Sequence, residues 1–133
     1  MTIQFSRRLA LALGILTPLA ETIRRWSTWK EDPAALFDDY ILGGFLLYGA
    51  WRVGKSVHSG QRFLAAAWAF TCGMAYLSFF GQLHSLRAGE ADPAPIGSKW
   101  VLIIKGTGLV LAALALVISL RRIPDVSVEP YSK

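Results

Sequence analysis

The sequence predicts an all-α fold: an integral membrane four-helix bundle that runs up-down-up-down, with both termini cytoplasmic. Three observations support this prediction. Of the 133 residues, 53% are hydrophobic and only 17% are charged, whereas ordinary soluble domains carry about 25% charged residues. Four apolar stretches approach the roughly 20 residues that a membrane-spanning helix requires. The segments between these stretches are short, and basic residues are unequally distributed among them.

The composition also excludes several classes of protein. A mean hydropathy of +0.41 rules out a disordered chain, because disordered segments are poor in apolar residues. The net charge of +5 comes in short clusters between apolar runs, which disfavours a nucleic-acid partner. Cys72 is the only cysteine, so an internal disulfide and a cysteine-based zinc cluster are both excluded. No phosphate-binding or metalloprotease motif occurs, and we expect neither a metal nor a cofactor.

The first predicted helix covers about residues 7–26. Its apolar core is short, and it reaches spanning length if Arg7 and Arg8 extend their charged ends out of the bilayer. The same pattern is compatible with a cleaved signal peptide. For cleavage after Ala20, Pro18 would occupy the third position before the cleaved bond, where a small residue is required. This disfavours cleavage, but the alternative stays open.

The other three helices are predicted over about residues 36–54, 62–84 and 98–121. The third is free of charge through its middle, and the fourth carries one charge there, Lys105. Backbone groups in lipid must be hydrogen-bonded internally, which favours helices over open strands. Residues 122–133 form a polar tail, and the chain has room for one transmembrane domain only.

The predicted orientation follows from the basic residues, because lysine and arginine in short loops favour the cytoplasmic side. More of them lie at the termini and between the second and third helices than on the opposite face. That larger group is Arg7, Arg8, Arg52, Lys55, Arg62, Arg121, Arg122 and Lys133. We therefore expect a multi-pass protein of the cell membrane with both termini inside, and we take the membrane to be a prokaryotic inner membrane.

Tryptophans stand close to the ends of the predicted helices. Trp26, Trp29 and Trp100 fall at the predicted outer boundary of the bilayer, and Trp51 falls at the inner one. Tryptophan is enriched at both membrane–water interfaces. We expect these four side chains to be interface anchors that contact the lipid bilayer.

Small residues recur at spacings of three or four in each helix. Helix association in lipid depends on close backbone approach at such residues. The sequence therefore predicts helix packing at Gly14, Gly43, Gly73, Gly108 and Ala112.

Helical spacing places three charges on these small-residue faces. Glu21 lies four residues after Thr17, Asp39 four before Gly43, and Lys105 three before Gly108. Ionisable groups within the membrane are costly and are usually paired. We expect a buried polar cluster near the outer rim, and its predicted members are Glu21, Arg24, Asp38, Asp39, His84 and Lys105.

Three interpretations of this cluster remain open. It can be a salt-bridge network that fixes helix register, a site for a bound or transported ligand, or a site for a divalent cation. Carboxylate and imidazole groups suit such a cation, but the ammonium of Lys105 would repel it. The cluster is therefore not predicted to be a metal site.

For function, the sequence favours a non-enzymatic scaffold or accessory subunit that associates with other membrane subunits or with a second copy. The alternative is a small transporter or channel that binds an ion or a small acidic or cationic substrate at the cluster. A membrane enzyme is the third possibility. Glu21, Asp38 and His84 could act in general acid–base catalysis only if they bordered a cavity.

Overall fold

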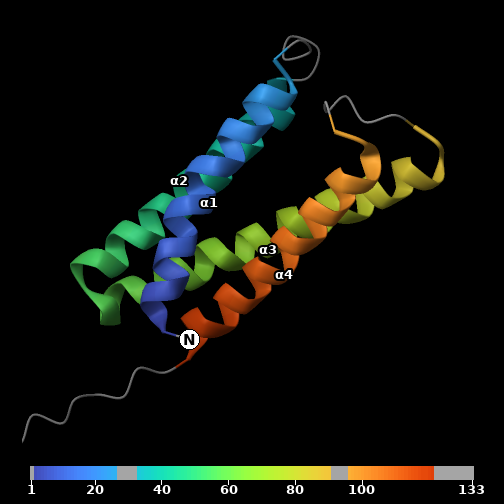
Figure 1. Cartoon of the computed structure of the whole chain (residues 1–133). Helices are drawn as coiled ribbons and strands as arrows, with labels where there is room; N and C mark the ends of the chain where they lie inside the picture. Colours follow the sequence, from blue (N-terminus) through green and yellow to red (C-terminus); the bar gives the residue numbers. More distant parts are fainter. Residues whose placement is uncertain (1, 27–32, 91–95, 122–133) are drawn as a thin grey trace, which may run out of the picture.

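The computed structural model describes residues 2–26, 33–90 and 96–121. The chain forms four helices: α1 (Ile3–Arg24), α2 (Pro33–Lys55), α3 (Val57–Arg87) and α4 (Ser98–Leu120). They run alternately up and down (Figure 1). The prediction of an all-α four-helix up-down bundle is therefore confirmed. The predicted polar tail and Trp29 lie outside the described residues.

The connection between α2 and α3 differs from the prediction. The predicted helices left residues 55–61 between them as a connection, but Ser56 alone separates α2 from α3. Its backbone is extended, with φ −155° and ψ 117°. Gly60 is needed one turn later because a side chain there would collide with the backbone of Arg52 and Val53. Gly60 therefore marks a close approach between α2 and α3.

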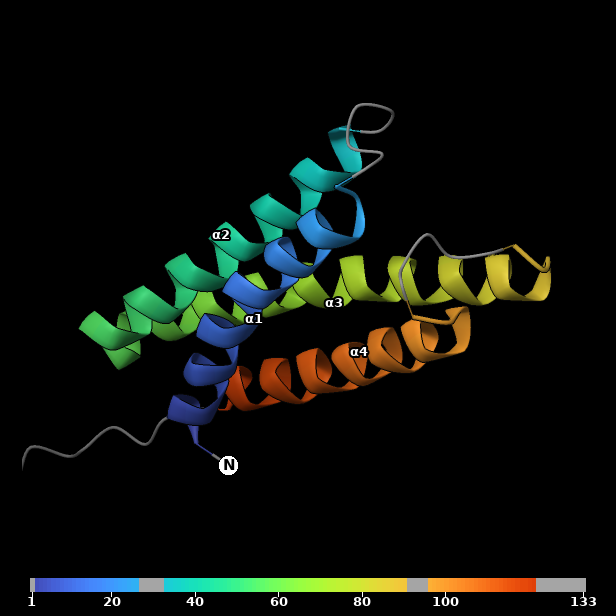
Figure 2. The ribbon, with the colours of Figure 1, turned by 45° about the horizontal axis from the view of Figure 1, so that its top comes forward.

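The four helices form two hairpins that cross and diverge. α1 packs on α2, α2 on α3 and α3 on α4, whereas α1 and α4 touch much less extensively. Figures 1 and 2 show that the hairpins meet at one end and separate toward the other. The closed end is the one where α1 begins, α2 is joined to α3, and α4 ends. The open end holds the end of α1 and the beginning of α4.

The hydrophobic core lies between the middle of the bundle and the closed end. Trp68 and Leu46 are its largest fully buried side chains, and small residues fill the spaces around them. The other members are Ala10, Leu42, Ala50, Val53, Leu64, Ala67, Ala112 and Ala115. Interdigitation of large and small side chains brings the helix axes close together here.

Buried hydrogen bonds connect the two hairpins at the closed end. The indole Nε1 of Trp68 donates to Oγ of Ser6 at 2.8 Å. The hydroxyls of Ser6 and Ser119 are also 2.8 Å apart. α1, α3 and α4 are thus joined at one buried point, and such interhelical bonds stabilise bundles in water and in lipid.

Two more polar contacts complete the closed end. Nε of Arg7 donates to the carbonyl oxygen of Ala50 at 3.0 Å, which ties α1 to α2. Nε2 of Gln61 donates to the carbonyl oxygen of Ser119 at 2.7 Å, which ties α3 to α4. The second bond satisfies a carbonyl in the last turn of α4, where the helix itself offers no partner.

Among the described helices, α3 and α4 are long and apolar enough to cross a membrane. Their most apolar windows have a mean hydropathy of 1.6 and 2.5. The prediction of four membrane spans is thus supported in part, by two helices. α1 and α2 carry more charge, with Arg7, Arg8 and Glu21 in one and Asp38 and Asp39 in the other.

Candidate functional site

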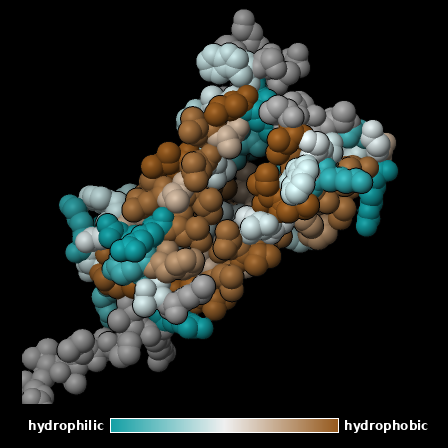
Figure 3. Space-filling model, viewed as in Figure 1, coloured by the Kyte–Doolittle hydropathy of each residue, from teal (hydrophilic) through white to brown (hydrophobic). Residues whose placement is uncertain are grey.

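A cavity of about 900 Å³ opens between the two hairpins at the open end. The space-filling view shows the hollow between the two arms, bordered by hydrophobic residues (Figure 3). All four helices contribute to its wall. Five of the six predicted cluster residues line it, and these are Glu21, Arg24, Asp38, Asp39 and Lys105.

On α1 the carboxylate of Glu21 is held by arginines of its own helix. Nη1 of Arg24 lies 2.7 Å from one carboxylate oxygen, and Nε of Arg25 lies 3.1 Å from the other. The spacing of three and four residues places these groups on one helix face. Such partly exposed pairs contribute at most about 1 kcal/mol each to stability, so their main effect is to fix the Glu21 side chain.

On α2 the two aspartates differ in exposure. Asp39 is half-buried and Asp38 is exposed, although both border the cavity. The neighbouring Tyr40 hydroxyl lies 2.9 Å from Oγ1 of Thr22, which itself donates to the Pro18 carbonyl oxygen at 2.6 Å. The Tyr40 hydroxyl is therefore the donor in its bond to Thr22, and this bond fixes the α2 wall against α1.

On the opposite wall Lys105 is positioned by a buried amide. Its Nζ donates to Oε1 of Gln82 at 3.1 Å, across the α3–α4 interface. Gln82 is buried. It was expected at the level of the cluster but was not among its predicted members. Its signal was available, because a glutamine within an apolar helix requires a hydrogen-bond partner.

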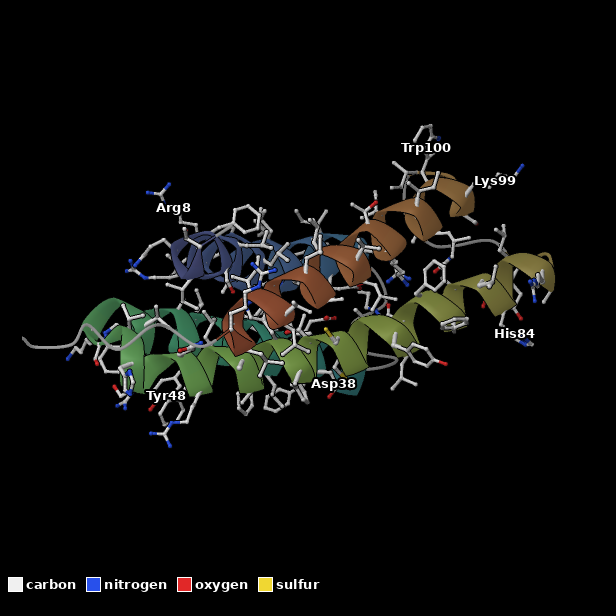
Figure 4. The ribbon with its side chains drawn as sticks, turned by 90° about the horizontal axis from the view of Figure 1, so that it is seen from below. Arg8, Asp38, Tyr48, His84, Lys99 and Trp100 are labelled. Atoms are coloured by element: carbon white, nitrogen blue, oxygen red, sulfur yellow. The ribbon has the colours of Figure 1, made fainter. Side chains whose placement is uncertain are left out.

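His84 does not belong to the site. It is exposed, it is absent from the cavity wall, and its side chain points away from the bundle (Figure 4). The physical reason is helix periodicity. Two residues correspond to about 200° of rotation, so His84 faces the opposite way from Gln82. The prediction that His84 joins the cluster is therefore wrong.

Away from the charged groups the cavity wall is mostly apolar. Toward the closed end it is formed by Leu13 and Leu42 of the first hairpin and by Met74 and Leu111 of the second. The cavity thus has a charged region near the open end and an apolar region toward the middle of the bundle. This arrangement suits a molecule with a polar group and an apolar body.

The residues predicted to pack the helices occupy different environments. A Cβ added at Gly43 would lie 2.6 Å from the carbonyl oxygen of Gly14, so α1 and α2 approach closely here. Ala112 is fully buried. Gly73 and Gly108 differ from the prediction, since a Cβ at either would meet no atom within 4 Å. Gly73 faces outward, and Gly108 lines the cavity.

Three of the four predicted anchor tryptophans lie in the described part of the chain. Trp26 and Trp100 are 75% and 65% exposed at the open end, and Figure 4 shows Trp100 pointing outward beside Lys99. Trp51 lies near the closed end, with Nζ of Lys55 4.5 Å from its ring centroid. All three positions are compatible with a membrane interface, and their role as anchors stays a prediction.

Within residues 2–26, 33–90 and 96–121, no group of three or more His, Cys, Asp or Glu side chains is arranged to hold a metal ion. Comparisons with protein-family models, curated proteins and solved structures found no match to this chain. Inferences about function therefore depend on the cavity and on the surface of the bundle.

Proposed function

We propose that the chain is a multi-pass protein of a prokaryotic inner membrane and acts as a non-enzymatic scaffold or accessory subunit of a membrane assembly. The observation that carries the proposal is the number of large apolar side chains exposed on all four helices. Soluble monomers rarely expose apolar patches larger than a few hundred Å². The exposed residues include Ile15, Leu16, Leu19, Ile41, Phe45, Phe70, Tyr76, Leu77, Ile103, Ile104, Val110 and Val117.

The burial of α3 and α4 also supports a membrane environment. Core helices of soluble proteins are apolar as well, but they are mostly buried. Only 28% of the apolar window of α3 and 22% of that of α4 is buried inside the bundle. Helices so apolar and so exposed are stable in lipid, whereas in water they would leave most of their apolar surface solvated.

The charges of α1 and α2 are compatible with a position beside α3 and α4 in the bilayer. Glu21 and Asp39 border the cavity, and Arg7 is bonded to a carbonyl of α2. The outward residues of the same helices include Leu19 and Phe45, which are apolar. Ionisable groups in membrane proteins usually face the bundle interior in this way.

A surface on α3 is suited to a protein partner. Tyr76, Leu77 and Phe80 are exposed there, and the rings of Tyr76 and Phe80 have centroids 4.6 Å apart. Aromatic residues are enriched in protein interfaces. Another membrane subunit or a second copy of the chain would cover this surface.

A transporter or channel is the second candidate, and the cavity with its charged groups favours it. The two functions make different demands on Lys105. A transporter requires its charge for flux, whereas in a scaffold its bond to Gln82 contributes to stability only.

Membrane placement is tested first by alkaline carbonate extraction and cysteine accessibility. In a Cys72→Ser background, single cysteines at Ser56 and at Gly89 should react from opposite sides of the membrane, with Ser56 facing the cytoplasm. A chain that carbonate releases from the membrane would refute the proposal. Labelling of both positions from one side would refute the up-down arrangement across the bilayer.

The subunit function is tested by purification from native membranes in mild detergent. We expect a protein partner or a second copy in fixed stoichiometry. Tyr76→Ala/Leu77→Ala should release it, while the control Ile15→Ala/Leu16→Ala on α1 should retain it. A monomer without a partner would contradict the scaffold function and leave the transporter as the better candidate.

A further inference from the structure

We propose that the cavity at the open end binds one zwitterionic glycerophospholipid of the outer leaflet, with its phosphate at Lys105 and its amine at Asp39. The inference rests on the membrane placement proposed above. It goes further in naming the chemical class of the occupant. Its three supports are the depth of the cavity, the distribution of charge on its walls, and its continuity with the exposed apolar surface.

The depth of the cavity matches one leaflet. Its wall on α1 extends from Leu13 to Arg24, which is about 16 Å at 1.5 Å per residue. The hydrocarbon core of a bilayer is about 30 Å thick, so the cavity extends through about half of it. Its volume of about 900 Å³ lies near the upper end of ordinary ligand sites.

The two long walls carry charges of opposite sign. The first hairpin lines the cavity with three carboxylates, Glu21, Asp38 and Asp39, and one guanidinium, Arg24, and the second presents the ammonium of Lys105. Glu21 is already held by two arginines. A ligand with one sign of charge would be attracted to one wall and repelled by the other. A headgroup that contains both a phosphate and an amine complements both walls.

The environment of Lys105 favours binding to a phosphate. Nζ of Lys105 donates to Oε1 of Gln82, and Lys105 itself lines the cavity. Lysine binds phosphate through charge-assisted hydrogen bonds, which are stronger than neutral ones. Asp39, half-buried on the facing hairpin, is the corresponding acceptor for an ammonium group.

The cavity is continuous with the surface that would face lipid. Ile23, Ile103 and Ile104 line it, and all three are also largely exposed. The hairpins diverge at this end (Figure 2), so an acyl chain has a lateral path between them. The apolar wall at Leu13 and Leu111 is where the chain would end.

The charge requirement is tested with the full chain purified in detergent, using native mass spectrometry to count bound lipid. One molecule of dioleoyl phosphatidylethanolamine should bind to each chain. Dioleoyl phosphatidylglycerol, which lacks the amine, should bind about tenfold more weakly. Lys105→Met should weaken phosphatidylethanolamine binding by about tenfold or more. Lys99→Met is the matched control, because Lys99 lies on the same helix and points outward (Figure 4).

The amine contact is tested by Asp39→Asn. This variant should lose the preference for phosphatidylethanolamine over phosphatidylglycerol, while the control Glu90→Gln, at an exposed position beyond α3, should keep it. Equal binding of the two lipids to the unaltered chain would overturn the assignment of a zwitterionic occupant. So would a Lys105→Met chain that binds as tightly as Lys99→Met.

The shape requirement is tested without any change of charge. Gly108→Leu places a side chain in the cavity, and Gly73→Leu places the same side chain on the outer surface of α3. A Cβ meets no atom within 4 Å at either position, so both variants should fold. Gly108→Leu should lose the bound lipid and Gly73→Leu should retain it. Equal retention would overturn the proposal, and this pair decides it if Lys105→Met fails to fold.

The failure of this inference is distinguishable from that of the proposed function. A chain that carbonate releases from membranes refutes the membrane placement. A chain that resists carbonate and retains no phosphatidylethanolamine refutes the lipid site alone.

Discussion

The contact between Gly43 and Gly14 gives the sharpest test of how α1 and α2 pack. A methyl group at Gly43 would lie 2.6 Å from the Gly14 carbonyl oxygen and 3.1 Å from the ring of Pro18. Backbone cannot yield as a flexible side chain does, so Gly43→Ala must push the helices apart. Gly44 is the ideal control, because a methyl group at that neighbouring position meets no atom within 4 Å.

The expected magnitude comes from two opposing effects. Alanine improves helix propensity over glycine by about 0.8–1.0 kcal/mol, and this gain is shared by Gly43→Ala and Gly44→Ala. Overpacking at a close contact costs about 1–3 kcal/mol, and only Gly43→Ala incurs it. The free energy of unfolding of Gly43→Ala should therefore be about 1–3 kcal/mol lower than that of Gly44→Ala.

The measurement is denaturant unfolding of both variants in the same detergent, followed by far-UV circular dichroism. Both variants share the gain in helix propensity. The difference between their free energies of unfolding therefore reports the close contact at Gly43 alone. Equal stabilities within about 0.5 kcal/mol, the usual range for surface substitutions, would show that α1 and α2 do not approach closely at Gly14.

Two further predictions concern the closed end. Ser6→Ala should lower the free energy of unfolding by about 1–3 kcal/mol, because it leaves the buried indole N–H of Trp68 without its acceptor. Ser119→Ala should cost less, since the bond of Trp68 to Ser6 survives, and a larger loss for Ser119→Ala would contradict this account. Arg7→Lys should cost about 1 kcal/mol by removing the Nε bond, and Arg8→Lys, at an exposed position, should have no measurable effect in the same unfolding titration.

The helices themselves are largely predictable from the sequence. Long apolar runs bounded by charged or turn-forming residues suffice to locate them, and the absence of charge in the middle of α3 made it the clearest. Spacing along each helix also predicts which charged residues face inward. Glu21, Asp39 and Lys105 all border the cavity because three or four residues return to the same helix face.

The relations between helices are harder to predict. Gly60 fell between two predicted helices. Glycine marks both turns and close approaches, and only the three-dimensional contact distinguishes them. His84 was assigned to the polar cluster because of its expected depth in the membrane, without regard to the face of α3 on which it lies. The divergence of the hairpins depends on crossing angles set by many side chains together, so no local pattern reveals the cavity.

A rotation of one hairpin about the closed end would change the width of the cavity mouth at the open end. At the closed end Ser6 and Trp68 connect the two hairpins, while the bonds Tyr40–Thr22 and Lys105–Gln82 near the open end each lie within one hairpin. A helix of 20 residues is about 30 Å long, so a rotation of 5° at its fixed end displaces the other end by about 2.6 Å. Ser6 precedes Glu21, which lines the cavity, by 15 residues, or about 22 Å along α1.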